Sequence, residues 1–135
     1  MFTPVSTRSA SAYKRVSVET SIDGASPHQL ICLLFDALLL SLAKARGAIA
    51  RGEMDLKGKE ISRAVRILEE GLKDGLNKEQ GGELAVNLLG VYNYSISRLT
   101  MANIKNDEGL IIEVSDLIKT VFEAWKSIAT PAAHV

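Results

Sequence analysis

Four long stretches of the sequence repeat apolar residues every three or four positions, and only short polar connectors separate them. The stretches cover about residues 26–51, 56–76, 82–105 and 108–129. Apolar residues at this spacing fall on one face of an α-helix. Connectors of so few residues make consecutive helices antiparallel neighbours. The sequence therefore predicts an all-α fold, an up-down antiparallel four-helix bundle.

The inner stripes of the four helices supply the candidate core. They comprise Ile31, Leu34, Phe35, Leu38, Leu42, Ala45 and Ile49; Ile61, Ala64, Val65, Leu68, Leu72 and Leu76; Leu84, Leu88, Tyr92, Ser95, Leu99 and Ala102; and Ile111, Val114, Ile118, Val121, Trp125 and Ile128. The first helix also carries explicit end signals. Ser26, Pro27 and Gln29 form a capping box with proline at the first helical position, and Gly52 can take the left-handed C-terminal conformation.

The rest of the chain lacks these patterns. Residues 1–25 are rich in Ser, Thr and Ala and keep no period, so we expect a flexible N-terminal arm, able to form a short extra helix around residues 12–18. Residues 26–130 form the predicted bundle domain. Residues 131–135 are expected to be a disordered tail.

Charge and hydropathy exclude several classes of partner. Sixteen Lys and Arg residues balance sixteen Asp and Glu residues, so no net field favours nucleic acid, and we expect no nucleic-acid partner. The longest apolar run, within residues 30–40, is interrupted by Asp36 and is shorter than the ~20 residues that span a bilayer. We expect no membrane insertion. The N-terminus has no apolar signal-peptide segment, and the lone Cys32 fits a reducing compartment, which together predict a cytoplasmic protein.

The sequence offers little for catalysis. His28 and His134 have no Cys or carboxylate partners at metal-ligand spacing, so we expect no metal and no cofactor. Cys32 lies four residues after His28, but the apolar residues around it favour an inert thiol. A small enzyme that uses Cys32 or His28 remains as a minor alternative to a binding protein.

Two of the predicted helices carry apolar residues outside the core stripes. On the first helix this second face comprises Cys32, Leu33, Asp36, Leu39, Leu40, Ala43 and Gly47. On the third it comprises Val86, Gly90, Asn93, Tyr94, Ser97, Met101 and Ile104. Small residues beside large apolar ones predict a groove that another helix or extended chain can approach closely. Each buried leucine contributes roughly 1.5–3 kcal/mol, so we expect something to cover these faces.

Two kinds of cover are compatible with the pattern. The arm, through Tyr13, Val16, Val18 and Ile22, can fold back over one face, or a homodimer can bury it. A partner segment can instead lay its own apolar face into the groove, in the helix-in-groove mode of recognition. An arm that covers the empty groove would be displaced when the partner arrives.

An ordered set of short motifs carries a family resemblance over residues 12–128. The motifs are Ala12-Tyr13, Ser26-Pro27-His28-Gln29-Leu30-Ile31, Leu34-Phe35-Asp36, Glu79-Gln80-Gly81-Gly82-Glu83-Leu84-Ala85, Asn87-Leu88, Val91-Tyr92, Arg98-Leu99, Ala102-Asn103, Asn106-Asp107, Glu113-Val114 and Ala124-Trp125. In this order and at these separations they resemble the flagellar secretion chaperone family FliS. The chain departs from the family at Phe35 and Ala37, where tyrosine and glycine are usual, and at Asn93 and Ser95 on either side of Tyr94.

The resemblance implies a cytosolic chaperone that binds the disordered C-terminal segment of flagellin. Such chaperones prevent premature polymerisation and deliver flagellin to the type III export apparatus, so a component of the export gate is a further implied partner. It also implies roles for Tyr13 in the arm, for Asp36 as a polar anchor, and for Asn103, Asn106 and Asp107, which close the third helix; a helix N-cap also explains the last two.

The second faces and the resemblance together give one predicted client-binding set. It comprises Tyr13, Val16, Leu33, Asp36, Leu40, Val86, Gly90, Asn93, Tyr94, Ser97, Met101, Asn103 and Ile104. The alternative is a homodimeric structural or adaptor bundle without a flagellin client, in which the second face is a weak dimer interface.

Overall fold

The computed structural model describes residues 26–76 and 78–133, and within them it contains four helices and no strand. The elements are α2 (Pro27–Arg51), α3 (Met54–Arg66) with its π-helical continuation η1 (Ile67–Lys73), α4 (Lys78–Lys105) and α5 (Glu108–Ala133). The all-α prediction is confirmed. No helix in the described part of the chain is both long and apolar enough to span a membrane.

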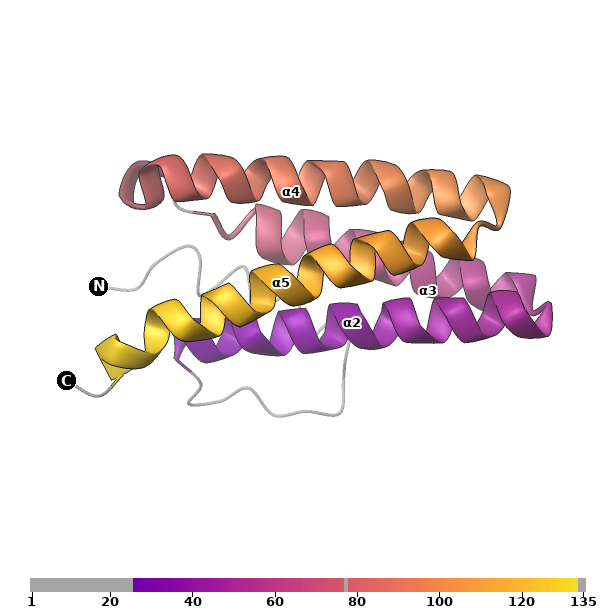
Figure 1. Cartoon of the computed structure of the whole chain (residues 1–135), viewed down its shortest axis with the longest axis horizontal. Coiled ribbons are helices and arrows are strands. Elements are labelled where there is room, and N and C mark those ends of the chain that lie inside the picture. Colours follow the sequence, from indigo (N-terminus) through magenta and orange to yellow (C-terminus); the bar gives the residue numbers. More distant parts are fainter. Residues whose placement is uncertain (1–25, 77, 134–135) are drawn as a thin grey trace.

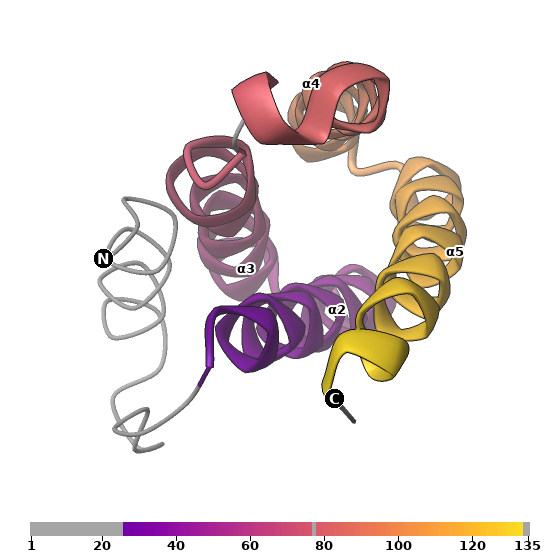
Figure 2. The same ribbon diagram turned by 90° about the vertical axis from the view of Figure 1, so that its left-hand side faces the viewer.

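The helices run alternately up and down around a single core. Figure 1 shows that each helix reverses the direction of the one before it, and Figure 2 shows α2 and α4 on opposite sides, with α3 and α5 between them. The largest fully buried side chains come from all four helices. They are Phe35, Leu34, Leu38, Leu42, Ile61, Ile67, Leu68, Leu99, Ile111, Ile118 and Val114.

The ends of α2 form as the sequence predicts. Ser26 Oγ accepts a hydrogen bond from the Gln29 amide at 3.1 Å, and the Ser26 amide donates to Gln29 Oε1 at 2.8 Å. These two bonds complete the capping box. At the other end Gly52 has φ 74° and its amide donates to the carbonyls of Ala48 and Ile49. The left-handed conformation explains why glycine ends this helix.

The second predicted helix is only partly regular. It begins at Met54, and from Ile67 to Lys73 its turns are π-helical. In a π-helix each amide bonds five residues back, so the turn holds more residues and the side chains shift in phase. That shift lets Ile67, Leu68 and Leu72 all be buried. The predicted stripe residues of this segment all lie at the core, and the π-helical turns add Ile67, which the sequence analysis did not name.

The third predicted helix begins, as expected, close to Gly82. The assigned helix α4 starts at Lys78, but Gly82 has φ 53° and ψ −127°, which breaks it into a short first turn and a long helix. After this kink Ala85 is buried, whereas Leu84, which we expected in the core, is 46 % exposed. Core residues recur every three or four positions from Ala85 to Ala102. Leu84 comes one position before this repeat and therefore points away from the core.

The fourth helix keeps the predicted seam over its first half only. Ile111, Val114 and Ile118 are buried, but Ile128 is 54 % exposed and Phe122 takes the buried position next to Val121. A straight α-helix drifts by about 20° per heptad against a strict seven-residue repeat, so the seam rotates away from the core. The helix itself continues to Ala133. The proposed division into arm, bundle domain and tail stays a prediction.

A buried lysine holds the corner between α3, α4 and α5. Lys57 Nζ donates to the backbone carbonyl of Asn103 at 2.9 Å and to Asn106 Oδ1 at 2.6 Å. Asn106 has φ 54°, and Asp107 Oδ1 accepts a bond from the Gly109 amide at 2.9 Å. Lys57 thus satisfies acceptors at the C-terminal end of α4, and Asp107 is the N-cap of α5.

Candidate functional site

The outer side of α4 is an exposed surface with many apolar side chains and a long uncharged stretch. Residues 84–97 contain no Asp, Glu, Lys or Arg. Of the large apolar side chains that are exposed in the described residues, most lie on this helix: Leu84, Val86, Tyr94, Met101 and Ile104. Gly90, Asn93 and Ser97 are exposed between them. The predicted second face of this helix is therefore open to solvent, at 60 % for Val86 and 74 % for Ile104.

The second face of α2 is smaller than the sequence suggested. Leu40 is 55 % exposed, and Asp36 is exposed one turn before it. Leu33 and Leu39 are half-buried and pack against the core cluster. Of the predicted second face of this helix, only Asp36, Leu40 and Ala43 are thus left exposed.

The two surfaces do not meet. α2 and α4 stand diagonally across the bundle, and their outer sides face in opposite directions (Figure 2). Within residues 26–76 and 78–133, one continuous groove lined by both sets is therefore not formed. A partner that touches both surfaces has to pass around α3 or α5.

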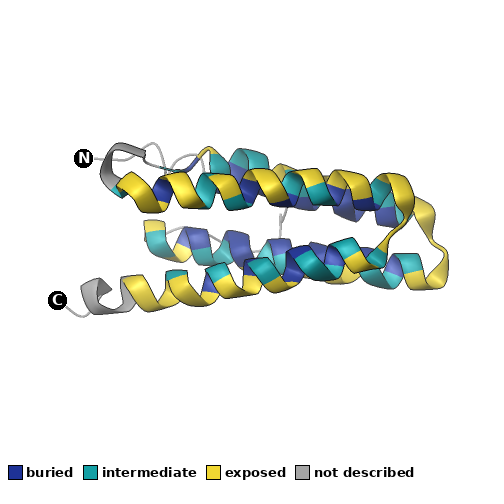
Figure 3. Ribbon diagram, turned by 45° about the horizontal axis from the view of Figure 1, so that its top comes forward, coloured by how far each residue is buried: buried dark blue, intermediate teal, exposed yellow. Residues whose placement is uncertain are grey.

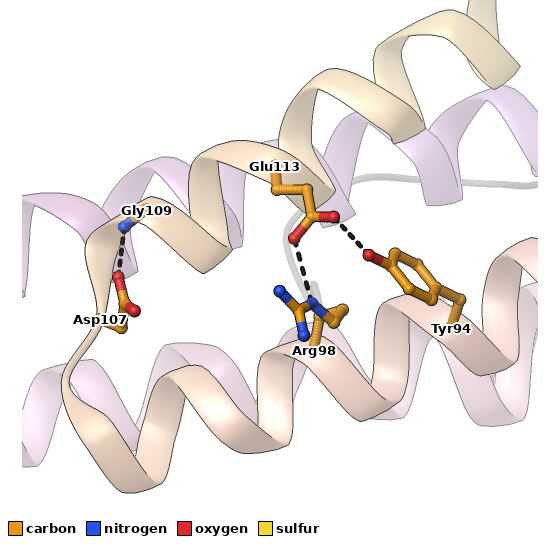
Figure 4. Close-up of polar contacts among 5 residues, drawn as sticks. All are labelled: Tyr94, Arg98, Asp107, Gly109 and Glu113. Atoms are coloured by element: carbon orange, nitrogen blue, oxygen red, sulfur yellow. Dashed lines mark hydrogen bonds and ion pairs between the residues drawn. The ribbon is translucent and has the colours of Figure 1, made fainter.

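A polar bridge lies beside the α4 surface and ties it to α5 (Figure 4). Tyr94 Oη donates a hydrogen bond to Glu113 Oε2, and Arg98 Nε donates to Glu113 Oε1 at 3.1 Å. The Arg98 guanidinium also lies 5.7 Å from the centre of the Tyr94 ring. The bridge fixes the hydroxyl end of Tyr94, so its ring is held at the border of the apolar surface.

The bridge shifts the protonation of its members. The hydrogen bonds from Tyr94 and Arg98 lower the pKa of Glu113. The same hydrogen bond to Glu113 raises the pKa of Tyr94. Both shifts favour the neutral tyrosine and the ionised glutamate. Arg98 and Glu113 stood in the sequence motifs without an assigned role, and only the packing of α4 on α5 shows that they pair.

Cys32, His28 and Trp125 form a separate cluster where α2 meets α5. Cys32 Sγ lies 3.7 Å from His28 Nε2, and the His28 and Trp125 rings are 5.1 Å apart. Burial, followed by the charge of Asp36, raises the pKa of the Cys32 thiol. The thiol is therefore protonated near neutral pH and is a poor nucleophile. No group of three or more metal-binding side chains occurs in the described part of the chain.

The remaining predicted residues divide in two. Asn103 is half-buried, and its carbonyl is bound by Lys57, so its place is at the α3–α4 contact rather than on the outer surface. Tyr13 and Val16 lie outside the described residues. The structure thus brings together the predicted residues on α4, except Asn103, and leaves Leu40 and Asp36 on the opposite side.

Comparison with known proteins gives a consistent result over almost the whole chain. Residues 9–132 match the family described as Flagellar protein FliS. The chain is 46 % identical over 122 residues to the flagellar secretion chaperone FliS of Salmonella typhimurium, covering 90 % of each chain. It is 44 % identical over 117 residues to the flagellar secretion chaperone FliSB of Pseudomonas aeruginosa, covering 87 % of this chain and 92 % of that one. For the flagellar secretion chaperone FliS of Bacillus subtilis the identity is 34 % over 115 residues, covering 85 % and 81 %.

Proposed function

Because this chain belongs to the FliS family of flagellar secretion chaperones, which are not enzymes, we propose that its client is the C-terminal segment of flagellin. The observation that carries the proposal is the exposed apolar surface of α4, which has no charged residue from position 84 to position 97. A helix with apolar side chains open to water on its outer side is stabilised when an apolar partner covers it. An amphipathic client segment supplies such a partner.

The mechanism we propose is sequestration. The client segment is disordered when free and folds against α4, so its apolar side chains are no longer available to other flagellin molecules. Ordering the segment costs several kcal/mol, about 2–5 or more, and a large contact area offsets that cost. Premature polymerisation is prevented because the same side chains cannot contact two partners at once.

The client is then released from the chaperone during export. We propose that the complex forms in the cytoplasm and that the chaperone delivers the client to the type III export apparatus, where a component of the export gate is the second partner. The polar bridge at Tyr94 and the patch at Leu40 and Asp36 are further contacts that a long client segment can use.

The direct test is a titration of the full chain with a peptide of about forty residues from the C-terminus of flagellin of the same cell, a length of about 60 Å if helical. Isothermal calorimetry measures affinity and stoichiometry, and far-ultraviolet circular dichroism measures helix formation. We expect one-to-one binding with a gain of helix. A scrambled peptide of the same composition is the control. No binding of the native peptide to a folded bundle would contradict the proposal.

A further inference from the structure

The outer side of α3 carries a row of three basic residues, Lys59, Arg63 and Arg66. They lie four and then three residues apart, so they share one side of the helix over a length of about 10 Å. Lys59 and Arg66 are exposed, and Arg63 is half-buried. Long basic side chains keep their charged ends in water even where their stems are partly covered. The basic row therefore presents its positive charges to solvent.

The acids of the described chain leave this row uncompensated. None of the three basic residues takes part in a hydrogen bond or an ion pair with another described residue. In α3 itself, Asp55 is exposed one turn before Lys59, and Glu60 is buried. Glu69, which follows the row, is paired with Lys73. The exposed side of α3 thus has an excess of positive charge.

The basic row destabilises the helix that carries it. Like charges four residues apart on a helix, such as those of Lys59 and Arg63, repel each other. Basic side chains elsewhere on the outside of the bundle, such as Arg98 and Lys126, each pair with a glutamate. A partner with negative charge would remove the repulsion within the row.

We propose that the basic row binds the anionic headgroups of a lipid bilayer, with α3 lying along the membrane surface and no helix inserted. Lys and Arg near an anionic leaflet are attracted to it without insertion. Among the described residues from Asp55 to Arg66, no large apolar side chain is exposed. Protein interfaces are centred on apolar and aromatic anchors, which this side of α3 lacks. Headgroups diffuse until they match the spacing of the row, whereas the phosphates of a nucleic acid stand at fixed intervals.

This orientation leaves the apolar surface of α4 accessible. Figure 2 shows that the outer sides of α3 and α4 face different directions, and Figure 3 shows exposed positions recurring along the outer side of α4. A chain that rests on α3 can therefore hold a partner on α4 at the same time. The membrane contact depends on α3 alone. If the proposed function holds, this contact brings the loaded chaperone to the membrane that the client has to cross.

Co-sedimentation of the full chain with sucrose-loaded vesicles, without client, tests the contact. The vesicles contain equal parts of phosphatidylglycerol and phosphatidylcholine, and vesicles of phosphatidylcholine alone are the control. We expect binding to the anionic vesicles at about 0.01 M salt and loss of binding at about 1 M, where the screening length is only about 3 Å. No binding to anionic vesicles at low salt, or equal binding to the neutral vesicles, would overturn the proposal.

Charge-reversal variants test whether the contact lies on α3. Lys59→Glu and Arg66→Glu should each weaken vesicle binding by roughly five- to thirtyfold, because each removes an attraction and adds a repulsion. Lys119→Glu makes the same change at an exposed position of α5, across the bundle from α3 (Figure 2), and should leave binding unchanged. The variants are compared at about 0.1 M salt, where a screening length of about 10 Å confines the effect to nearby charges. Equal losses in all three folded variants would show that net charge, not the row, governs binding.

Two further probes test for other anionic partners. Labelled polyuridine and polyglutamate are each titrated into the wild type and into Lys59→Glu. If either probe binds in a Lys59-dependent way while the vesicles do not bind, the row serves a nucleic acid or an acidic protein segment, and the assignment to lipid is wrong. Binding of the flagellin peptide is measured separately and should be unchanged in Lys59→Glu, so the membrane contact and the proposed function can fail independently.

Discussion

At the scale of single residues, the buried side chain of Lys57 links α3 to the C-terminal end of α4. Its two acceptors, the Asn103 carbonyl and Asn106 Oδ1, lie at the C-terminal end of α4, where the last carbonyls have no amide partner within the helix. We predict that Lys57→Met lowers the free energy of unfolding by about 1–3 kcal/mol, because the part-buried hydrogen bonds from Lys57 to Asn103 and Asn106 are lost. Lys59→Met, at an exposed position of the same helix, should change it by less than about 0.5 kcal/mol. Urea denaturation measures both, and equal effects would refute this role.

Two glycines in neighbouring segments should respond oppositely to alanine. Gly52 has φ 74°, which alanine adopts poorly, so Gly52→Ala should destabilise the bundle by about 1 kcal/mol. Gly58 is within α3, and an added Cβ would lie 3.9 Å from Asn103 Oδ1, an ordinary contact. Gly58→Ala should therefore stabilise by up to about 1 kcal/mol. Thermal unfolding of the two variants measures the signs, and a shared sign would contradict this assignment.

The buried residues that could be predicted from sequence are those that belong to the three- or four-residue repeat of apolar side chains. Leu34, Leu38 and Leu99 were expected in the core and are fully buried. Lys57 and Glu60 are also buried, at 8 % and 4 % exposure, and nothing in their local sequence distinguishes them from solvated charges. Their burial depends on how α3 packs against its neighbours, and a single helix does not contain that information.

At the scale of elements, Glu113 links α5 to α4 through its hydrogen bonds with Tyr94 and Arg98. Its pKa is lowered in the folded chain by Tyr94 and Arg98, so the bridge stabilises the fold above the ordinary glutamate pKa of 4.5 and is lost as the pH falls through the lowered value. We predict that Glu113→Gln is less stable than the wild type at neutral pH and that the difference shrinks in acid. Guanidinium denaturation from neutral to acid pH measures it.

The control for this pH dependence is Glu123→Gln. Glu123 pairs within α5 with Lys126, three residues along the same helix, and is 75 % exposed. Its replacement should therefore cause little change at any pH. If the difference in stability between the wild type and Glu113→Gln stays the same at every acid pH, the bridge is not what couples α4 to α5.

The existence of the helices was predictable from sequence. Which residues of each helix face the core was not predictable in every turn. End signals such as Ser26 and Gly52 act within a few residues, which is why the bounds of α2 were foreseen. The π-helical turns from Ile67 and the kink at Gly82 arise where packing on the rest of the bundle outweighs local preference. Such features change which side chains of a helix face the core, so Leu84 is exposed and Ala85 is buried instead.

At the scale of the whole molecule, the bundle holds the two candidate surfaces apart. The sequence assigned each surface to a helix but did not show where the two helices lie relative to each other. The outer side of α4 and the patch at Leu40 lie diagonally apart, because the up-down order puts α2 and α4 in opposite corners (Figure 2). Periodicity assigns a residue to a face of its own helix but does not say which helices are neighbours. The sequence therefore predicted the candidate residues on α4 but not the distance between the two surfaces.

A client segment long enough to pass around the bundle would contact both surfaces. We predict that Met101→Glu and Leu40→Glu each weaken binding of the flagellin peptide by roughly tenfold or more, because each places a charge against the client's apolar side. Both side chains are exposed, at 38 % and 55 %, so circular dichroism should show unchanged helix content. The effects should add in the double variant, since distant sites act independently.

Ser62→Glu adds the same charge to an exposed position of α3 and should leave affinity unchanged, which controls for the altered net charge. If Met101→Glu weakens binding and Leu40→Glu does not, the client lies on α4 alone, and the patch on α2 is free for another partner. If neither variant affects binding, the client uses a surface that the exposed apolar residues do not mark, and the mechanism proposed here is wrong.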